Sequence, residues 1–259
     1  MDQLYIIKVG GNIIDDEPRL KSFLSSFSKI EGKKILVHGG GKLATKLASD
    51  LSIPQQMVDG RRITDKDTLR IVTMVYAGWI NKQIVAQLNA LSSPSIGICG
   101  ADGNTIIAHK RIHPTIDFGF VGDVDQINIS LLQSLLQNNT NIIVAPITQD
   151  ANGQLLNTNA DTIAQEIAKA MSKVYHTNLI YSFEKKGVMK DIQDETSVIP
   201  TMNLSLYNKL KEEQSIFAGM IPKLDNAFAA IASGVSKVII GDALELNELI
   251  KGKSGTTIC

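Results

Sequence analysis

The sequence has 259 residues, enough for one or two domains at about 150 residues each. Hydrophobic residues make up 44% and charged residues 20%, so the chain can bury a core and is not intrinsically disordered. The 26 basic residues balance the 26 acidic ones, which argues against a nucleic-acid partner or a polybasic membrane anchor. Two cysteines provide no disulfide framework, and no apolar run approaches the roughly 18 residues that span a bilayer, so we expect a cytoplasmic protein.

Apolar, β-branched runs alternate with amphipathic helical segments along the chain. Strands are predicted at 4–9, 34–37, 96–99, 142–145, 179–183 and 238–240, hairpins over 104–125, and helices at 18–30, 43–51, 64–91, 131–136, 161–171, 204–213 and 220–232. Strands separated by helices need crossover connections, which predicts an α/β fold with a mainly parallel sheet covered on both faces. A junction near 171–176 predicts two lobes, 1–172 and 173–259.

Two glycine turns follow the first two predicted strands. The first contains Lys8, Gly10 and Gly11, and the second is His38-Gly39-Gly40-Gly41. Bare backbone N–H groups in such turns can approach an anion, and the dipole of the following helix adds to the attraction. Either turn alone would more often be structural. Because both emerge at one edge of a parallel sheet and Lys8 adds a cation there, we predict phosphate binding.

Other nucleotide and metal motifs are incomplete. Gly252-Lys253-Ser254 lacks the leading glycine of a Walker A loop, since Asn247 stands in its place, and the first turn has no G-x-G-x-x-G fingerprint. The protein-kinase signature set is absent from the sequence. The four histidines lack metal-ligand spacing, so we predict no metal held by protein side chains.

Three polar segments precede predicted helices. Asn157, Asn159 and Asp161 alternate before the helix at 161–171, and a single N-cap would account for only one of them. Arg62 precedes the helix at 64–91, where its guanidinium could clamp a carboxylate, although a solvated arginine is the common alternative. Lys223 begins an alanine-rich helix, where it opposes the helix dipole unless it neutralises a bound anion.

In this order the motifs resemble those of the N-acetylglutamate kinase family within the amino-acid kinase superfamily. The matching segments span nearly the whole chain, at 7–11, 37–41, 59–64, 119–123, 145–147, 157–161 and 218–223. The resemblance implies a three-layer αβα sandwich around a mainly parallel open sheet. It also implies phosphorylation of the γ-carboxylate of N-acetylglutamate in arginine biosynthesis, with ATP as co-substrate and Mg²⁺ carried on ATP.

The resemblance assigns roles to individual residues. Lys8 and Lys223 would contact the phosphates, and Asp161 would orient both lysines. The remaining roles are substrate binding by Gly39, Gly40, Arg62, Asn157 and Asn159, phosphate binding by Gly10, Gly11 and Gly41, and nucleotide binding by Phe183, Glu184, Lys185, Gly187 and Gly219. The N-terminal lobe would hold the acylglutamate and the C-terminal lobe ATP. The nucleophile is an ionised carboxylate, so no general base is needed.

Three departures from the family pattern leave the substrate and the activity open. The nucleotide segment at 183–188 has Glu184 where aspartate is usual, which affects the expected nucleotide contacts. Arg61 stands where an apolar residue is usual, and Trp79 where a small or polar one is. An extra cation beside the substrate would suit the third carboxylate of N-succinylglutamate, which is the alternative substrate. The sequence also leaves open a catalytically inactive regulatory protein and a kinase of aspartate, glutamate or carbamate.

The resemblance also bears on assembly and regulation. Arginine-inhibited hexamers of the family carry an additional helix before the first strand, and here the first predicted strand begins at Leu4. We therefore expect the arginine-insensitive type, a homodimer joined through the helical region at 65–91.

Overall fold

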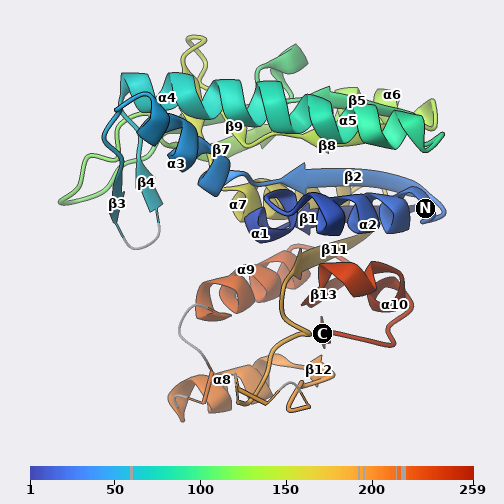
Figure 1. Cartoon of the computed structure of the whole chain (residues 1–259). Helices are drawn as coiled ribbons and strands as arrows, with labels where there is room; N and C mark the ends of the chain where they lie inside the picture. Colours follow the sequence, from blue (N-terminus) through green and yellow to red (C-terminus); the bar gives the residue numbers. More distant parts are fainter. Residues whose placement is uncertain (59–60, 192, 195, 214, 217–219) are drawn as a thin grey trace. The chain divides into compact units, whose positions relative to one another are not determined.

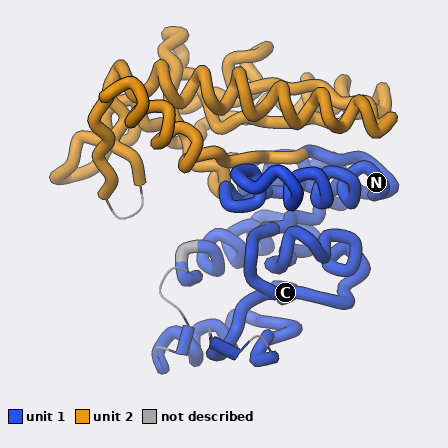
Figure 2. The backbone as a smooth tube through the Cα atoms, in the orientation of Figure 1, with its two compact units in different colours: residues 1–35, 164–259 blue, residues 36–163 orange. Residues whose placement is uncertain are grey.

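The computed structural model describes residues 1–58, 61–191, 193–194, 196–213, 215–216 and 220–259. The chain forms two compact units (Figure 2). Unit 1 comprises Met1–Ile35 and Ala164–Cys259, and unit 2 comprises Leu36–Ile163. The chain passes from unit 1 to unit 2 within strand β2 (Lys33–His38) and returns within helix α7 (Ala160–Met171). The two units are defined by which residues pack together. The predicted lobes, 1–172 and 173–259, are defined by the ligand that each would bind, and they stay a prediction.

The strands of unit 1 form a mainly parallel ladder. In spatial order they are β12 (Thr201–Met202), β14 (Thr256–Ile258), β13 (Lys237–Asp242), β11 (His176–Phe183) and β1 (Gln3–Val9). The pairs β1–β11, β11–β13 and β12–β14 are parallel, whereas β13–β14 is antiparallel. Strands β1, β11 and β13 are almost continuously buried, as expected for parallel strands covered on both faces.

Helix α2 (Glu17–Ser28) of unit 1 begins where its sequence predicts, with a capping aspartate and a proline in the first turn. The Asp16 side chain accepts a hydrogen bond from the Arg19 N–H at 3.0 Å, and Pro18 lies in the first turn. Its apolar face, which includes Phe23 and Phe27, is buried and packs near α10 (Leu246–Ile250) and the short η4 (Ala243–Glu245). The other helices are α1 (Gly11–Ile14), α8 (Leu204–Glu212) and α9 (Ile221–Ala232).

Unit 2 contains a parallel pair, a mixed sheet and a hairpin. Strands β5 (Ser95–Ile98) and β8 (Asn141–Val144) are parallel. The four-stranded sheet has the order β10 (Leu155–Asn157), β9 (Ile147–Gln149), β6 (Ile106–Lys110), β7 (Gly122–Ile127). The hairpin is β3 (Gln56–Val58) and β4 (Arg61–Ile63). Unit 2 also contains helices α3 (Gly41–Asp50) and α6 (Ile129–Gln137) and the short η2 (Asp102–Asn104).

A long helical run dominates unit 2 (Figure 1). It consists of α4 (Lys66–Thr73), a π-helical segment η1 (Met74–Ile80) and α5 (Asn81–Ala90). The predicted helix at 64–91 is therefore present but starts two residues later. Asp65 ends the preceding extended segment because its side chain caps α4 through the Thr68 N–H at 2.7 Å.

The predicted α/β fold with a mainly parallel sheet is confirmed, and so are the hairpin at 104–125, now β6–β7, and the predicted strands. The short strands β3, β4, β9, β10, β12 and β14 were not predicted. Within the described residues, no helix has both the length and the apolar composition needed to cross a membrane.

Candidate active site

The second glycine turn joins the end of β2 to the start of α3 in unit 2. Gly40 has φ +148°, a backbone conformation that L-residues with side chains rarely adopt. A Cβ at this position would lie 2.2 Å from Ile80 Cδ1, so the backbone packs directly on the helical run. Gly41 is the first residue of α3, and the turn therefore forms the N-terminus of a ten-residue helix. Backbone N–H groups at a helix N-terminus favour an anion, and phosphate binding at this turn stays a prediction.

Arg62 lies next to this turn. Its guanidinium donates to the Gly41 carbonyl at 3.0 Å, to Thr45 Oγ1 at 2.9 Å and to Gln55 Oε1. Arg62 is only 8% exposed, whereas Arg61 is exposed, because successive residues of strand β4 face opposite ways. Three of the five guanidinium N–H groups are used within the protein, which leaves at most two for a ligand.

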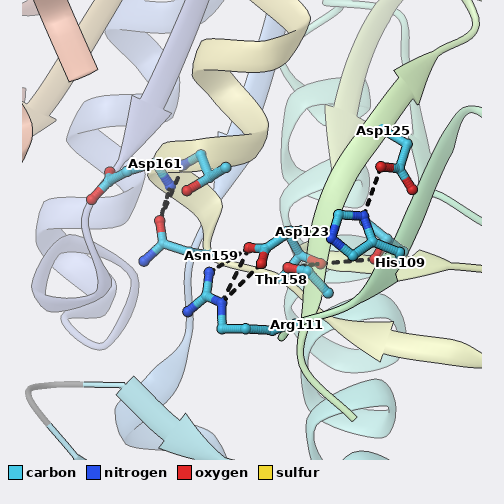
Figure 3. Close-up of polar contacts among 10 residues, drawn as sticks. His109, Arg111, Asp123, Asp125, Thr158, Asn159 and Asp161 are labelled. Carbon is cyan, nitrogen blue, oxygen red and sulfur yellow. Dashed lines mark hydrogen bonds and ion pairs between the residues drawn. The ribbon is translucent and has the colours of Figure 1, made fainter. Parts of the chain in front are cut away.

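The segment 157–161 is built from three distinct polar contacts. Asn157 Nδ2 donates to Thr64 Oγ1 at 3.0 Å, and Thr64 Oγ1 donates to the Arg62 carbonyl. Thr158 is buried and pairs with Thr148 at 2.8 Å. Asn159 Oδ1 accepts from the Asp161 N–H at 2.8 Å, which makes Asn159 the N-cap of α7 (Figure 3).

These contacts join two of the predicted substrate residues of unit 2, Arg62 and Asn157, to the predicted phosphate residue Gly41. Gly41, Arg62, Thr64 and Asn157 form a continuous chain of hydrogen bonds. The first two residues of the segment 59–64 lie outside the described residues. The predicted ligand roles of Gly39, Gly40, Arg62, Asn157 and Asn159 stay predictions.

A charged pair beside this segment was not predicted. Arg111 Nη2 donates to Asp123 Oδ1 at 2.5 Å, and its Nε lies 3.1 Å from Asp123 Oδ2 (Figure 3). The Arg111 guanidinium also lies 5.8 Å from the centroid of the Phe118 ring. Farther along the same strands, His109 Nδ1 lies 2.7 Å from Asp125 Oδ1. The pairing of β6 with β7 brings these groups together. Predicting these contacts from the sequence would have required the register in which the two strands pair.

In unit 1, the first glycine turn lies against the end of β11. The Gly10 N–H donates to the Ser182 carbonyl at 3.0 Å, and Ser182 Oγ donates to the Lys8 carbonyl at 2.8 Å. A Cβ on Gly10 would lie 3.5 Å from the Phe183 Cβ. Gly11 begins α1. Lys8 is half-buried at the end of β1, as expected from its place within an apolar strand.

Lys223 also reaches this part of unit 1. Its Nζ lies 5.6 Å from the centroid of the Phe183 ring, from the first turn of α9. Unit 1 therefore brings the first glycine turn, Phe183 and Lys223 to the same end of its sheet. The catalytic roles predicted for Lys8, Lys223 and Asp161 stay predictions.

The predicted nucleotide residues differ in their surroundings. Glu184 is half-buried and Lys185 is exposed. Gly187 is buried, and a Cβ there would lie 2.8 Å from Thr256 Oγ1, so close packing against β14 requires glycine at this position. Gly219 lies outside the described residues.

The comparisons with known proteins extend over almost the whole chain. Residues 3–242 match the model of the amino acid kinase family. The acetylglutamate kinase of Cytophaga hutchinsonii is 54% identical over 251 residues, covering 96% of this chain and 95% of that protein. That of Parabacteroides distasonis is 50% identical over 248 residues, covering 96% and 97%. Among solved structures, smu.665 from Streptococcus mutans has a TM-score of 0.80 at 26% identity, covering 99% of this chain and 98% of that one.

The fold and the family match define a kinase of the α/β class, with the αβα architecture that was predicted. The chain belongs to the amino acid kinase family, in its acetylglutamate kinase branch, as the resemblance implied. Kinases of this family take their phosphoryl group from ATP.

Proposed function

We propose that this chain transfers the γ-phosphoryl group of ATP to the γ-carboxylate of N-acetylglutamate, as a step of arginine biosynthesis. The observation that carries the proposal is the near-full-length identity with two acetylglutamate kinases, at 54% and 50%. The finer substrate assignment follows the names of those relatives.

The proposed reaction is a direct displacement at phosphorus. A carboxylate oxygen forms a bond to the γ-phosphorus while the bond to the ADP oxygen breaks, so the products are an acyl phosphate and ADP. A glutamate side chain with a pKa of about 4.3 is already ionised at neutral pH, and no side chain has to accept a proton. The protein is left to position the two substrates and to stabilise charge.

Within unit 2, we assign substrate binding to Gly39, Gly40, Arg62, Asn157 and Asn159, and phosphate binding to Gly41. Its support is the hydrogen-bonded chain from Gly41 through Arg62 and Thr64 to Asn157. The N–H groups of Arg62 that these bonds leave are on Nε and Nη1, which face different sides of the guanidinium, so a contact with the α-carboxylate would use one of them.

Within unit 1, we assign phosphate and nucleotide binding to Lys8, Gly10, Gly11, Lys223 and the segment that begins at Phe183. Its support is the convergence of the first glycine turn and Lys223 on Phe183. Asp161 is kept as the third catalytic residue. Mg²⁺ would be carried on the phosphates of ATP, where it neutralises part of their charge.

N-succinylglutamate, the alternative substrate, gains no support from Arg61 and Trp79. Arg61 is exposed on strand β4, on the side opposite Arg62. Trp79 is 65% exposed and lies with Met74 on η1 at the rim of a surface hollow. N-acetylglutamate is therefore the substrate we propose.

The residues that line this hollow are evidence for a homodimer. It has a volume of about 360 Å³ and is lined by Leu43, Lys46, Leu47, Asp50, Met74, Val75 and Trp79. An exposed tryptophan beside a half-exposed methionine is typical of a protein–protein contact. We propose that a second copy of this chain covers this face, with the opposite charges of Lys46 and Asp50 at its rim.

A trapping assay tests the proposed reaction. The purified chain is incubated with ATP, Mg²⁺, N-acetylglutamate and hydroxylamine, which converts an acyl phosphate to a stable hydroxamate. We expect hydroxamate to form only when N-acetylglutamate is present. Formation of ADP without hydroxamate would contradict the proposal, because the phosphoryl group would then have gone to water.

A further inference from the structure

A fully buried polar pair, His38 and Asn81, lies next to the second glycine turn in unit 2. His38 is the last residue of β2 and Asn81 is the first residue of α5, and both are 0% exposed. His38 Nδ1 lies 2.8 Å from the Gly39 carbonyl oxygen, and His38 Nε2 lies 3.2 Å from Asn81 Nδ2. A histidine buried to this extent cannot touch a substrate, so its role must be exerted through its neighbours.

The neighbours of Asn81 fix the orientation of its amide. Nδ2 lies 2.9 Å from the Ile143 carbonyl oxygen, which can only accept, and Oδ1 lies 3.1 Å from Lys82 Nζ, which can only donate. A flipped amide would put oxygen against oxygen and NH₂ against an ammonium group. The second Nδ2 hydrogen is therefore directed at His38 Nε2.

This orientation in turn fixes the proton on His38. Nε2 accepts a hydrogen bond from Asn81, so the single proton of the neutral ring is on Nδ1 and is donated to the Gly39 carbonyl. Burial lowers the pKa of His38 to about 4, which keeps the ring neutral at physiological pH. Each of the two Asn81 amide hydrogens and the single imidazole hydrogen of His38 therefore has its own acceptor.

The consequence for the glycine turn follows from peptide geometry. The peptide between Gly39 and Gly40 is trans, so its N–H points in the direction opposite to its carbonyl group. Because His38 holds the Gly39 carbonyl, the Gly40 N–H is directed away from His38. A Cβ on Gly40 would lie 2.2 Å from Ile80 Cδ1, so the Ile80 side chain packs against this glycine.

Strand β5 leaves the space that the Asn81 side chain occupies. A Cβ on Gly97 would lie 1.9 Å from Asn81 Oδ1, so only glycine in β5 leaves room for the amide. Lys82 Nζ donates to the Gly97 carbonyl at 2.8 Å as well as to Asn81. Strands β5 and β8 and helix α5 all hold the amide that orients the imidazole.

We propose that His38, oriented by Asn81, is a positioning residue for phosphoryl transfer that fixes the direction in which the Gly40 N–H is presented. The proposal rests on the function proposed above, in which Gly40 belongs to the substrate-binding turn, and it adds that the Gly40 N–H donates to the phosphoryl group as the bound carboxylate receives it. A donor directed at the charge that develops in the transition state acts on kcat more than on KM.

The tautomer of His38 can be measured without turnover. Selective ¹⁵N labelling of the four histidines, with His38 assigned by comparison with the His38→Asn spectrum, distinguishes a protonated from an unprotonated ring nitrogen. We expect the proton on Nδ1 at pH 7. A proton on Nε2 would overturn the proposal even if the chain proves to be an active kinase, and a chain without kinase activity would leave this result readable.

Kinetics separate positioning from packing. His38→Asn keeps a donor at the place of Nδ1 and is expected to retain kcat within about threefold. His38→Leu has a similar volume but no donor, and we expect kcat to fall about 10- to 100-fold with both KM values within about threefold. If His38→Leu and His38→Asn have the same kcat, the hydrogen bond has no positioning role.

Asn81→Ala provides a second test should His38→Leu fail to fold. It leaves the imidazole in place but removes the group that fixes its tautomer, so we expect kcat to fall about tenfold. Asn141→Ala is the matched control, since Asn141 is also a buried asparagine, at the start of β8, and bonds to Ser93, Pro94 and Ser95. Equal kcat in these two variants, with equal losses of Tm, would show that Asn81 is structural only.

Discussion

Arg62 and Lys34 are both buried cations, but the groups they contact differ. Lys34 Nζ donates to the Phe27 and Ile30 carbonyls at 3.3 and 2.7 Å, so it satisfies the carbonyl end of α2. Desolvation lowers the pKa of Lys34, and its ammonium group lies over the Phe27 ring. Arg62 instead contacts the glycine turn through Gly41. A buried cation thus completes a helix end in one case and contacts the glycine turn in the other.

Lys8→Met and Lys223→Met test the proposed phosphate contacts. Each removes a positive charge that would stabilise the transferring phosphoryl group, so we expect kcat to fall about 10²- to 10³-fold while Tm changes little. Lys21→Met is the matched control, because Lys21 is exposed and pairs with Glu17 one helical turn away. Wild-type kcat in both variants would exclude these lysines from the mechanism.

The buried imidazole of His38 makes stability depend on pH. Its pKa is about 4 in the folded protein and about 6.5 in the unfolded chain, so only the unfolded chain gains a proton between these values. The contribution of neutral His38 to the free energy of unfolding is fully present above pH 6.5 and is lost as the pH falls toward 4. The charge of Lys82 adds to the lowering of the His38 pKa.

We therefore expect this group to lower the free energy of unfolding by about 2 kcal/mol between pH 7 and pH 5. Urea unfolding at the two pH values, for the wild type and His38→Asn, measures the effect. The variant lacks the titrating group and should lose less stability on acidification. Equal losses in both proteins would mean that His38 is not buried in its neutral form.

At the scale of elements, the glycine turn of β2 and α3 is determined by contacts as much as by backbone freedom. Gly40 combines φ +148° with a Cβ position 2.2 Å from Ile80 Cδ1. Gly153 also has a positive φ, +84°, but nothing in the described part of the chain lies within 4 Å of its Cβ position. Substitution of Gly153 therefore introduces backbone strain alone, whereas substitution of Gly40 introduces backbone strain and a steric clash.

Gly40→Ala should cost more stability than Gly153→Ala. Strain alone costs about 1–3 kcal/mol, and the alanine at position 40 must also displace Ile80. We expect the Tm to fall in both variants, with kcat reduced only in Gly40→Ala because the turn moves. A Gly40→Ala enzyme with wild-type kcat would remove this turn from the proposed site.

The longer elements could be predicted from the sequence, and the shorter ones could not. Helix α2 was recognisable from its four-residue apolar spacing and the Asp16 cap. Strands β3, β4, β9, β10 and β14 have three residues each, too few to reveal an alternation of period two. Their positions depend on the partners with which they pair.

The site was predictable to a similar extent. The glycine turns and the 157–161 segment carry local patterns. Asp123 lies on β7 and Arg111 directly follows β6, and the register of these two strands shifts between Ile107 and Ala108. A shift of one residue changes which side chains meet. The bonds of Arg62 to Gly41 and Thr45 also join segments that only the tertiary fold brings together.

At the scale of the whole molecule, the proposed functions of the two units and of the dimer are separable. The proposed dimer face is on η1 and α3, whereas the proposed substrate residues are Gly39, Gly40, Arg62 on β4, and Asn157 and Asn159. A change that abolishes association should therefore leave the substrate contacts of unit 2 in place.

Trp79→Glu tests the proposed dimer face. We expect light scattering to report a dimer for the wild type and a monomer for Trp79→Glu, because a carboxylate would be buried at the interface. Ile112→Glu is the control, since Ile112 is 88% exposed but lies outside the hollow. A monomeric or hexameric wild type would contradict the proposal, and inhibition of the wild type by arginine would contradict the expected insensitivity.

The central claim is the identity of the phosphoryl acceptor, and the specificity constant measures it most directly. With ATP and Mg²⁺ at saturation, kcat/KM is determined for N-acetylglutamate, N-succinylglutamate, glutamate, aspartate and carbamate. We predict the largest kcat/KM for N-acetylglutamate. A larger value for any of the other four, or no phosphorylation of any acceptor, would contradict the claim.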